Sequence, residues 1–82
     1  MTISAQVAIY PLRQPHLTPA IDALVEAFRL HGLAPEAGAM STTVAGDADR
    51  LFAALRDGFA RAAESGHVVM TVTVSNACPL PR

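Results

Sequence analysis

Two segments of the chain repeat apolar residues at helical spacing, and this one-sided pattern most limits how the chain can fold. The first segment has apolar residues at positions i, i+3, i+4 and i+7, namely Ile21, Leu24, Val25 and Phe28. The second has four apolar residues that are predicted to face inward, namely Leu51, Phe52, Leu55 and Phe59. Each stripe covers one side of a helix, so both helices need an apolar layer to pack on.

Short signals mark where the two helices begin and end. Thr18 is predicted to cap the first helix, Pro19 falls in its first turn, and Gly32 is predicted to end it. Asp47 is predicted to cap the second helix and Gly66 to close it.

A glycine also lies inside the second helix, at Gly58. Glycine there costs about 1 kcal/mol relative to alanine. Either Gly58 allows a close approach by a strand or a partner, or this cost is simply tolerated.

Segments of period two surround the helices. Residues 3–10 alternate between apolar and small or polar side chains, which predicts a strand ended by Pro11. Residues 67–75 alternate in the same way and predict a final strand. Residues 35–46 are rich in small and β-branched side chains and predict a hairpin with its turn near residues 38–41.

These elements follow one another in βαββαβ order. Right-handed crossovers then place both helices on one face of a four-stranded antiparallel sheet, which is the α+β ferredoxin-like sandwich. We expect a single domain over residues 1–82, and a chain of this length buries only about 60% of its unfolded surface. A partner subunit would add stability to so small a domain.

The sheet face opposite the helices is predicted to carry no charge. Its members alternate along the first and last strands, namely Ser4, Gln6, Ala8, Tyr10, Val69, Thr71, Thr73 and Ser75. A solvated face normally carries charged side chains, so we expect this one to be covered by a second copy of the domain, by a small ligand at its edge, or by both. The alternative is a solvent-exposed face that is rich in threonine because strands favour threonine.

Charge and composition limit the classes of partner. The net charge is −1, with seven acidic and six basic residues, which argues against nucleic acid and anionic membranes as partners. No apolar run reaches the roughly 18 residues of a membrane span. The N-terminal MTISAQVAIYPL lacks the pattern of a signal peptide and one cysteine cannot form an internal disulfide, so we expect a cytoplasmic location.

The chemistries that this fold often carries are not supported by the residues present. The loop PLRQPH has no glycine for a phosphate cradle and no Cys-x-x-Cys pair, and the open face has one aromatic residue where RNA recognition needs several. His16, His31 and His67 are not at metal-ligand spacing, so we expect no metal centre and no cofactor. No catalytic constellation is recognisable and Cys78 is interpreted as a packing residue, so we expect a protein that is not an enzyme.

Uncharged polar groups gather at strand ends instead. They are Tyr10, Ser41, Thr42, Thr43, Ser75 and Asn76. Hydroxyls and a carboxamide donate and accept hydrogen bonds, which suits a neutral heterocycle such as an aminopyrimidine, with Tyr10 stacking on its ring. The alternative is a hairpin that uses these residues only because strands and turns favour them.

The stretches AIYPL, MSTTVAGD, LFAAL and HVVMTVTVSNACP, taken together, resemble the YkoF-type family that binds thiamine (vitamin B1) and hydroxymethylpyrimidine. The resemblance runs over nearly the whole chain. It implies non-catalytic binding of thiamine or its hydroxymethylpyrimidine moiety, in thiamine uptake or salvage. Some members carry the domain twice, so a single copy implies a homodimer or a tetramer built from dimers.

The resemblance also implies which residues border the ligand. Ser41 and Thr42 fall on the family's Ser-Thr pair, Tyr10 on its strand-end tyrosine, and Ser75 on the serine of its closing strand. Because the thiazolium ring of thiamine is cationic, Glu36 is the strand-region acid that would favour it, unless this glutamate is merely a solvated edge residue.

Two other readings stay open at this stage. One is a small-ligand-sensing regulatory or assembly module, as in amino-acid-sensing domains of the same element order. The other is an enzyme in which Cys78 is the residue to test.

Overall fold

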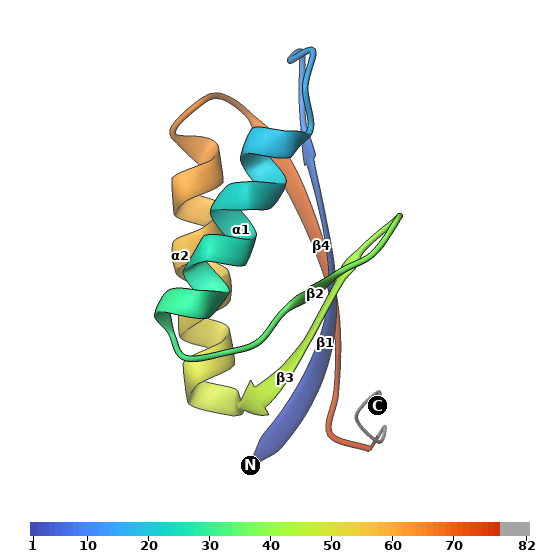
Figure 1. Ribbon diagram of the computed structural model, residues 1–82, viewed down its shortest axis with the longest axis vertical. Helices are drawn as coiled ribbons and strands as arrows, with labels where there is room; N and C mark the ends of the chain where they lie inside the picture. The colour runs from blue at the N-terminus through green and yellow to red at the C-terminus, as the bar shows by residue number, and fades with distance from the viewer. Residues whose placement is uncertain (78–82) are drawn as a thin grey trace.

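Four strands and two helices follow one another in the predicted βαββαβ order (Figure 1). The computed structural model describes residues 1–77. Its elements are β1 (Thr2–Pro11), α1 (Thr18–Leu30), β2 (Glu36–Ala37), β3 (Thr42–Asp47), α2 (Ala48–Ala63) and β4 (Val68–Ser75). The α+β ferredoxin-like fold predicted from the periodicities is thus confirmed, while Cys78 and Pro79 lie outside the described residues.

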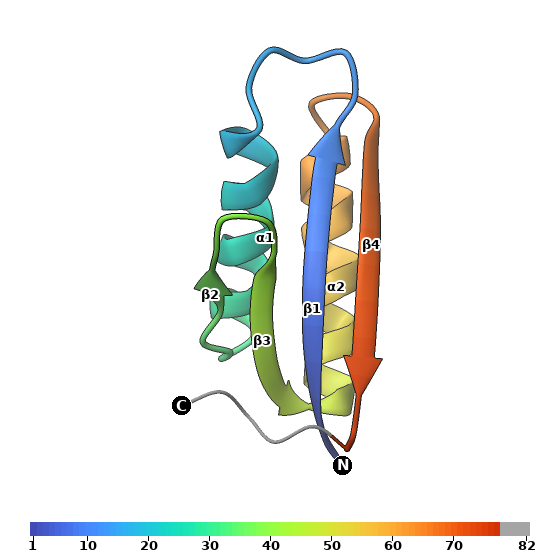
Figure 2. The same cartoon turned by 90° about the vertical axis from the view of Figure 1, so that its right-hand side faces the viewer.

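All four strands form one antiparallel sheet in the order β2-β3-β1-β4. Both helices lie behind it, with α1 on the side of β2 and β3 and α2 on the side of β1 and β4 (Figure 2). The other face of the sheet is open in the described residues. No helix among residues 1–77 is long and apolar enough to cross a membrane.

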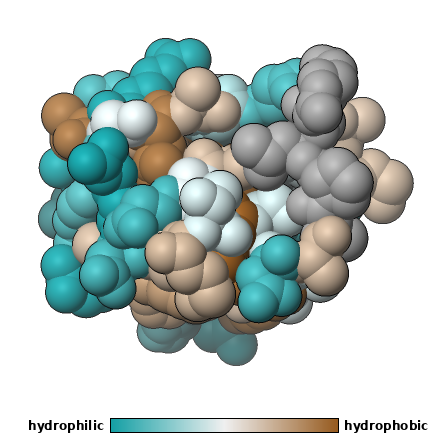
Figure 3. Space-filling model, turned by 90° about the horizontal axis from the view of Figure 1, so that it is seen from below, coloured by the Kyte–Doolittle hydropathy of each residue, from teal (hydrophilic) through white to brown (hydrophobic). Residues whose placement is uncertain are grey.

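The core lies between the sheet and the helices. The predicted inward positions of β1 are confirmed, because Ile3, Ala5, Val7 and Ile9 are all buried. They pack against the fully buried side chains of Phe28 and Leu51. Seen from the end where the N-terminus lies, much of the strongly hydrophilic surface is on the helix side (Figure 3).

The predicted inward face of α2 is partly wrong. Phe52 and Phe59 are 52% and 40% exposed. The buried side of α2 consists instead of Leu51, Ala54, Leu55, Gly58 and Ala62. Ala54, Gly58 and Ala62 on this side are small and let α1 come close, and the two aromatic rings lie on a flank of α2.

Gly58 marks the point of closest helix contact. A Cβ atom added there would lie 2.9 Å from Cδ1 of Leu24 and 3.4 Å from Cβ of Ala27. Of the two alternatives, the structure favours a close approach, but the neighbour is α1 and not the strand or partner that was expected.

Helix capping follows the prediction at one helix and not at the other. The side chain of Asp47 accepts a hydrogen bond from the backbone N–H of Arg50 at 3.3 Å, so this N-cap is confirmed. Thr18 is already the first helical residue of α1, and the N-cap position falls on Leu17, whose side chain makes no cap bond. Thr18 was therefore a wrong cap assignment, because the helix starts one residue earlier than its polar signal suggests.

The sheet margins hold the remaining differences. The hairpin turn is confirmed by a hydrogen bond from the N–H of Gly38 to the carbonyl of Ser41 at 2.8 Å. Val74 lies between the open-face residues Thr73 and Ser75 and so belongs to the helix side of β4, but it is 40% exposed, because β4 is the outermost strand and has no neighbour beyond it in the described residues.

Candidate ligand-binding site

An opening lies beside the end of β1, where β3 no longer covers it. β3 pairs with β1 only as far as Val7, whereas β4 pairs with β1 as far as Pro11. The last part of β1 therefore has one edge that no described strand occupies. The start of α1 and the β2–β3 hairpin close off the other sides and leave a cavity of about 190 Å³.

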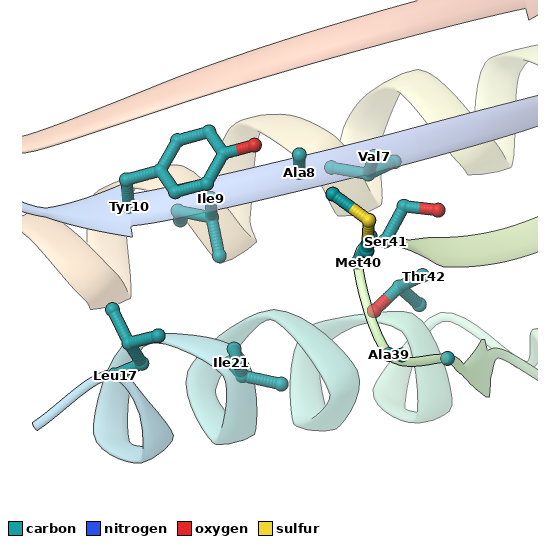
Figure 4. Close-up of a pocket in the computed structure, with 11 residues that line it drawn as sticks. Val7, Ala8, Ile9, Tyr10, Leu17, Ile21, Ala39, Met40, Ser41 and Thr42 are labelled. Carbon is teal, nitrogen blue, oxygen red and sulfur yellow. The ribbon is translucent and has the colours of Figure 1, made fainter.

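The walls of the opening are mainly apolar. Ile9 of β1 faces Leu17 and Ile21 at the start of α1, and Met40 stands at the hairpin end (Figure 4). Tyr10 borders the mouth, half-exposed, with its ring lying along β1 (Figure 4). Among residues 1–77, no charged side chain lines this opening.

The polar groups at the opening come from the hairpin. Thr42 is only 5% exposed, and its hydroxyl is turned toward the opening (Figure 4). Ser41 lies at the rim, where its hydroxyl accepts a hydrogen bond from the side-chain amide of Gln6 at 3.0 Å. Apolar walls with a few oriented polar groups are typical of small-molecule sites.

The structure brings three of the predicted site residues together. Tyr10, Ser41 and Thr42 all line the opening. Thr43 follows directly in sequence but points to the open face, because neighbouring strand residues alternate between faces. It pairs there with Gln6 on one side and with the exposed Glu36 on the other.

Ser75 and Asn76 are not brought to the opening. Ser75 pairs with Ser4, six positions along β1 from Tyr10, which corresponds to about 20 Å. The amide of Asn76 lies 4.0 Å from the sulfur of Met1, at the end of the sheet where the chain begins. Within one copy of the chain, these two residues belong to a different region.

Sequence reasoning missed Leu17, Ile21 and Met40 as site residues. Ile21 was assigned to the helical stripe, and Leu17 and Met40 carried no polar chemistry to draw attention to them. One usable signal was Met40, a large apolar residue within the predicted hairpin turn, and the structure shows it to be 86% exposed. The decisive feature, the early end of β3 along β1, depends on strand pairing and has no local signal.

A polar cluster of another kind joins the two helices away from the opening. Nε2 of His31 lies 2.6 Å from one carboxylate oxygen of Asp57. The other oxygen of this carboxylate accepts a hydrogen bond from Nε of Arg56 at 3.3 Å. The hydrogen bond with His31 lowers the pKa of Asp57, and Arg56 acts in the same direction. Within residues 1–77, no three His, Cys, Asp or Glu side chains are grouped so as to hold a metal ion.

The sequence matches one protein family along almost its entire length. The model of the YKOF-related family matches residues 2–80. The chain belongs to the YKOF-related family. None of the curated proteins that were compared matches this family member.

Solved structures share the fold of this YKOF-related protein. A hypothetical Methanocaldococcus protein superposes with a TM-score of 0.84 at 22% identity, over 98% of this chain and 84% of its own. A domain of unknown function, DUF77, from Bacillus cereus gives a TM-score of 0.77 at 19% identity, and the match covers 92% of this chain and 75% of that domain. A Thermotoga maritima protein with a suggested role in thiamine biosynthesis or salvage gives a TM-score of 0.77 at 17% identity, and the match covers 90% of this chain and 82% of that protein.

Proposed function

We propose that this YKOF-related protein binds thiamine or its hydroxymethylpyrimidine moiety without turning it over, with the pyrimidine ring in the opening beside β1. One observation carries the proposal: an uncharged, apolar opening at a free strand edge, with the hydroxyl of the largely buried Thr42 turned into it. Membership of the family and the thiamine-related structural neighbour support the choice of ligand.

The chemistry of the walls suits a flat, neutral, hydrogen-bonding ring. The ring faces pack against Ile9 and Ile21, and Tyr10 contributes aromatic surface at the mouth. An aminopyrimidine edge has both donors and acceptors, which match the Thr42 hydroxyl and the peptide groups along the edge of β1 that β3 leaves uncovered.

The size of the opening favours a single ring. Its volume of about 190 Å³ lies below the roughly 300–1,000 Å³ of pockets for drug-sized ligands. We therefore place the cationic thiazolium of thiamine outside the opening, where Glu36 of β2 is the acid that would attract it.

The protein is proposed to act as an oligomer. Along β1 and β4 the open sheet face carries Ser4, Gln6, Thr71 and Thr73 and no charge, which suits coverage by a second copy, while Glu36 lies at the β2 margin of this face. Ser75 and Asn76 would reach the ligand only from such a second copy. A role in thiamine uptake or salvage and a cytoplasmic location remain predictions.

Binding is proposed rather than catalysis because the walls of the opening contain hydroxyls but no acid, base or thiol among the described residues. Neither the family description nor the named neighbours assign a reaction. The test is therefore a binding measurement.

Isothermal titration calorimetry with hydroxymethylpyrimidine, thiamine and the thiazole alcohol tests the proposal. We expect saturable heat with the first two and none with the thiazole alone. Thr42→Val should weaken binding by roughly twofold to tenfold, because it removes a hydrogen bond worth about 0.5–1.5 kcal/mol. Thr43→Val is the matched control, and its dissociation constant should equal that of the wild type.

Two outcomes would contradict this site. One is the absence of heat with both pyrimidine ligands, and the other is an equal loss of affinity in Thr42→Val and Thr43→Val. Circular dichroism of each variant checks that the fold is retained.

A further inference from the structure

Hydrogen bonds at the two ends of β1 fix which way each of its peptide groups points. In an antiparallel sheet, the residues of a central strand direct their N–H and C=O groups to the two neighbouring strands in turn. Just past the end of β1, the N–H of Leu12 donates to the carbonyl of His67 at 2.8 Å, on the side of β4. At the other end, the carbonyl of Met1 accepts from the N–H of Ala48 at 2.9 Å, on the side of β3. Even-numbered residues of β1 therefore point to β4, and odd-numbered residues point to β3.

Ile9 is the odd-numbered residue whose strand partner is missing. Val7 pairs with Thr42 and is the last residue of β1 in register with β3. No described residue forms a hydrogen bond with Ile9 on that side. The side chain of Ile9 is buried in the core, but its backbone lies at the opening beside β1. One peptide donor and one peptide acceptor of the same residue thus face the opening without a partner among residues 1–77.

The rest of this edge is poorly suited to a further strand. Pro11 is the next odd-numbered residue, and proline has no N–H to offer a strand partner. The edge is also short, because Met40 and Thr42 lie at one end of the opening and Leu17 at the other (Figure 4). These features favour a small ring over an extended peptide as the occupant of the edge.

The N–H and C=O of one strand residue match a ring edge that has an acceptor next to a donor. In hydroxymethylpyrimidine, the amino group donates and the ring nitrogen beside it accepts. Such an edge can form the two hydrogen bonds that the opposite residue of an antiparallel strand would form with Ile9. Once a ring covers these peptide groups, leaving either of them unpaired costs free energy. A ring that satisfies both is therefore selected over a ring that satisfies one or neither.

We propose that Ile9 determines the specificity of the opening through its backbone: its N–H donates to a ring nitrogen, and its C=O accepts from the adjacent amino group. The class of ligand is then an aromatic heterocycle with an amino group beside a ring nitrogen. This inference rests on the proposed binding function and adds the atoms that select the ring. The Thr42 hydroxyl stays available for another polar group of the same ligand.

Amide hydrogen exchange followed by NMR tests the inference first without ligand. The amides of Val7, Ala8 and Tyr10 should be protected, because they are paired with β3 or β4. The Ile9 amide should exchange at least about tenfold faster than these three. An Ile9 amide that is as well protected as its neighbours in the unliganded protein would overturn the proposal.

The same measurement with saturating ligand tests the contact itself. Hydroxymethylpyrimidine should slow exchange of the Ile9 amide by at least about tenfold. The analogue that lacks the amino group should still protect Ile9, whereas the pyridine analogue with C–H in place of the nitrogen beside the amino group should not. Val72 is the control amide, because it points to the outer edge of β4, away from the opening, and its exchange should not respond to ligand.

Calorimetry on the same samples separates this inference from the binding proposal. Each analogue should bind roughly threefold to tenfold more weakly than hydroxymethylpyrimidine, because each loses one hydrogen bond. Ile9→Val keeps the peptide group, so its dissociation constant should stay within about twofold of the wild type. A loss in Ile9→Val as large as that of the analogues would assign the effect to the side chain and overturn the backbone role.

Two further outcomes are distinct from one another. Saturable heat with hydroxymethylpyrimidine but no change at the Ile9 amide overturns the backbone role alone. The absence of heat overturns the binding proposal, and this inference with it.

Discussion

At the scale of single residues, Asp57 links the two helices from outside the core. Its carboxylate contacts His31 at 2.6 Å and Arg56 at 3.3 Å while the side chain stays partly exposed. These contacts favour the charged carboxylate, which is why the pKa of Asp57 lies below its ordinary value.

This lowered pKa predicts a pH dependence with a definite sign. A carboxyl group whose pKa is lower in the folded state adds stability above its unfolded pKa of about 3.9, and the gain is lost as the pH falls through the folded value. In urea unfolding, Asp57→Asn should therefore be less stable than the wild type near neutral pH, and the difference should shrink in acid.

Asp22→Asn is the control for this measurement, because Asp22 is an exposed acid on α1. Its free energy of unfolding near neutral pH should stay close to that of the wild type. A constant difference between wild type and Asp57→Asn from neutral to acid pH would contradict the role of the carboxylate charge.

At the scale of elements, the contact between α1 and α2 depends on the absence of a side chain. Gly58 faces the buried Leu24 and Ala27, and a Cβ atom added at Gly58 would lie 2.9 Å from a Leu24 methyl group. Gly58→Val should destabilise the protein by about 1–3 kcal/mol through overpacking, even though glycine is the poorer helix former.

Ala60→Val tests whether this loss arises from packing. Ala60 is exposed on the same helix, so valine there should cost only its helix propensity, well under 1 kcal/mol. Chemical unfolding of both variants measures the difference, and equal losses would rule out the helix contact as the cause.

The same contact explains why the core side of α2 was predicted only in part. Leu51 and Leu55 were predicted to face inward and are buried, whereas Phe52 and Phe59 had the larger apolar side chains but not the core position. Hydrophobic spacing predicts that a helix has a buried side. The closeness of its neighbour decides whether large or small residues occupy it, and this depends on tertiary packing.

At the scale of the whole molecule, the chain is small and leaves one sheet face open in the described residues, on which Glu36 beside Thr43 is charged and the residues of β1 and β4 are not. Eighty-two residues provide a limited core. Association that buries this open face therefore adds to stability by mass action.

The thermal unfolding midpoint should accordingly rise with protein concentration. Differential scanning calorimetry of the wild type at several concentrations measures the rise, because dimerisation stabilises the folded state only. The rise should be much smaller in Thr71→Lys, which places a charge on the open face. A midpoint independent of concentration in the wild type would show that folding and association are not coupled.

The sequence by itself determined the order of the elements, the uncharged open-face residues of the first and last strands, the Asp47 cap and the Ser-Thr pair at the hairpin. These features depend on residue spacing within one segment, which period and capping chemistry predict directly. Only the tertiary structure decided that β3 stops opposite Val7, that Thr42 and Thr43 therefore serve different surfaces, and that Ser75 lies at the far end of the sheet from Tyr10. The physical reason is that strand register and relative strand length come from pairing between segments far apart in the chain.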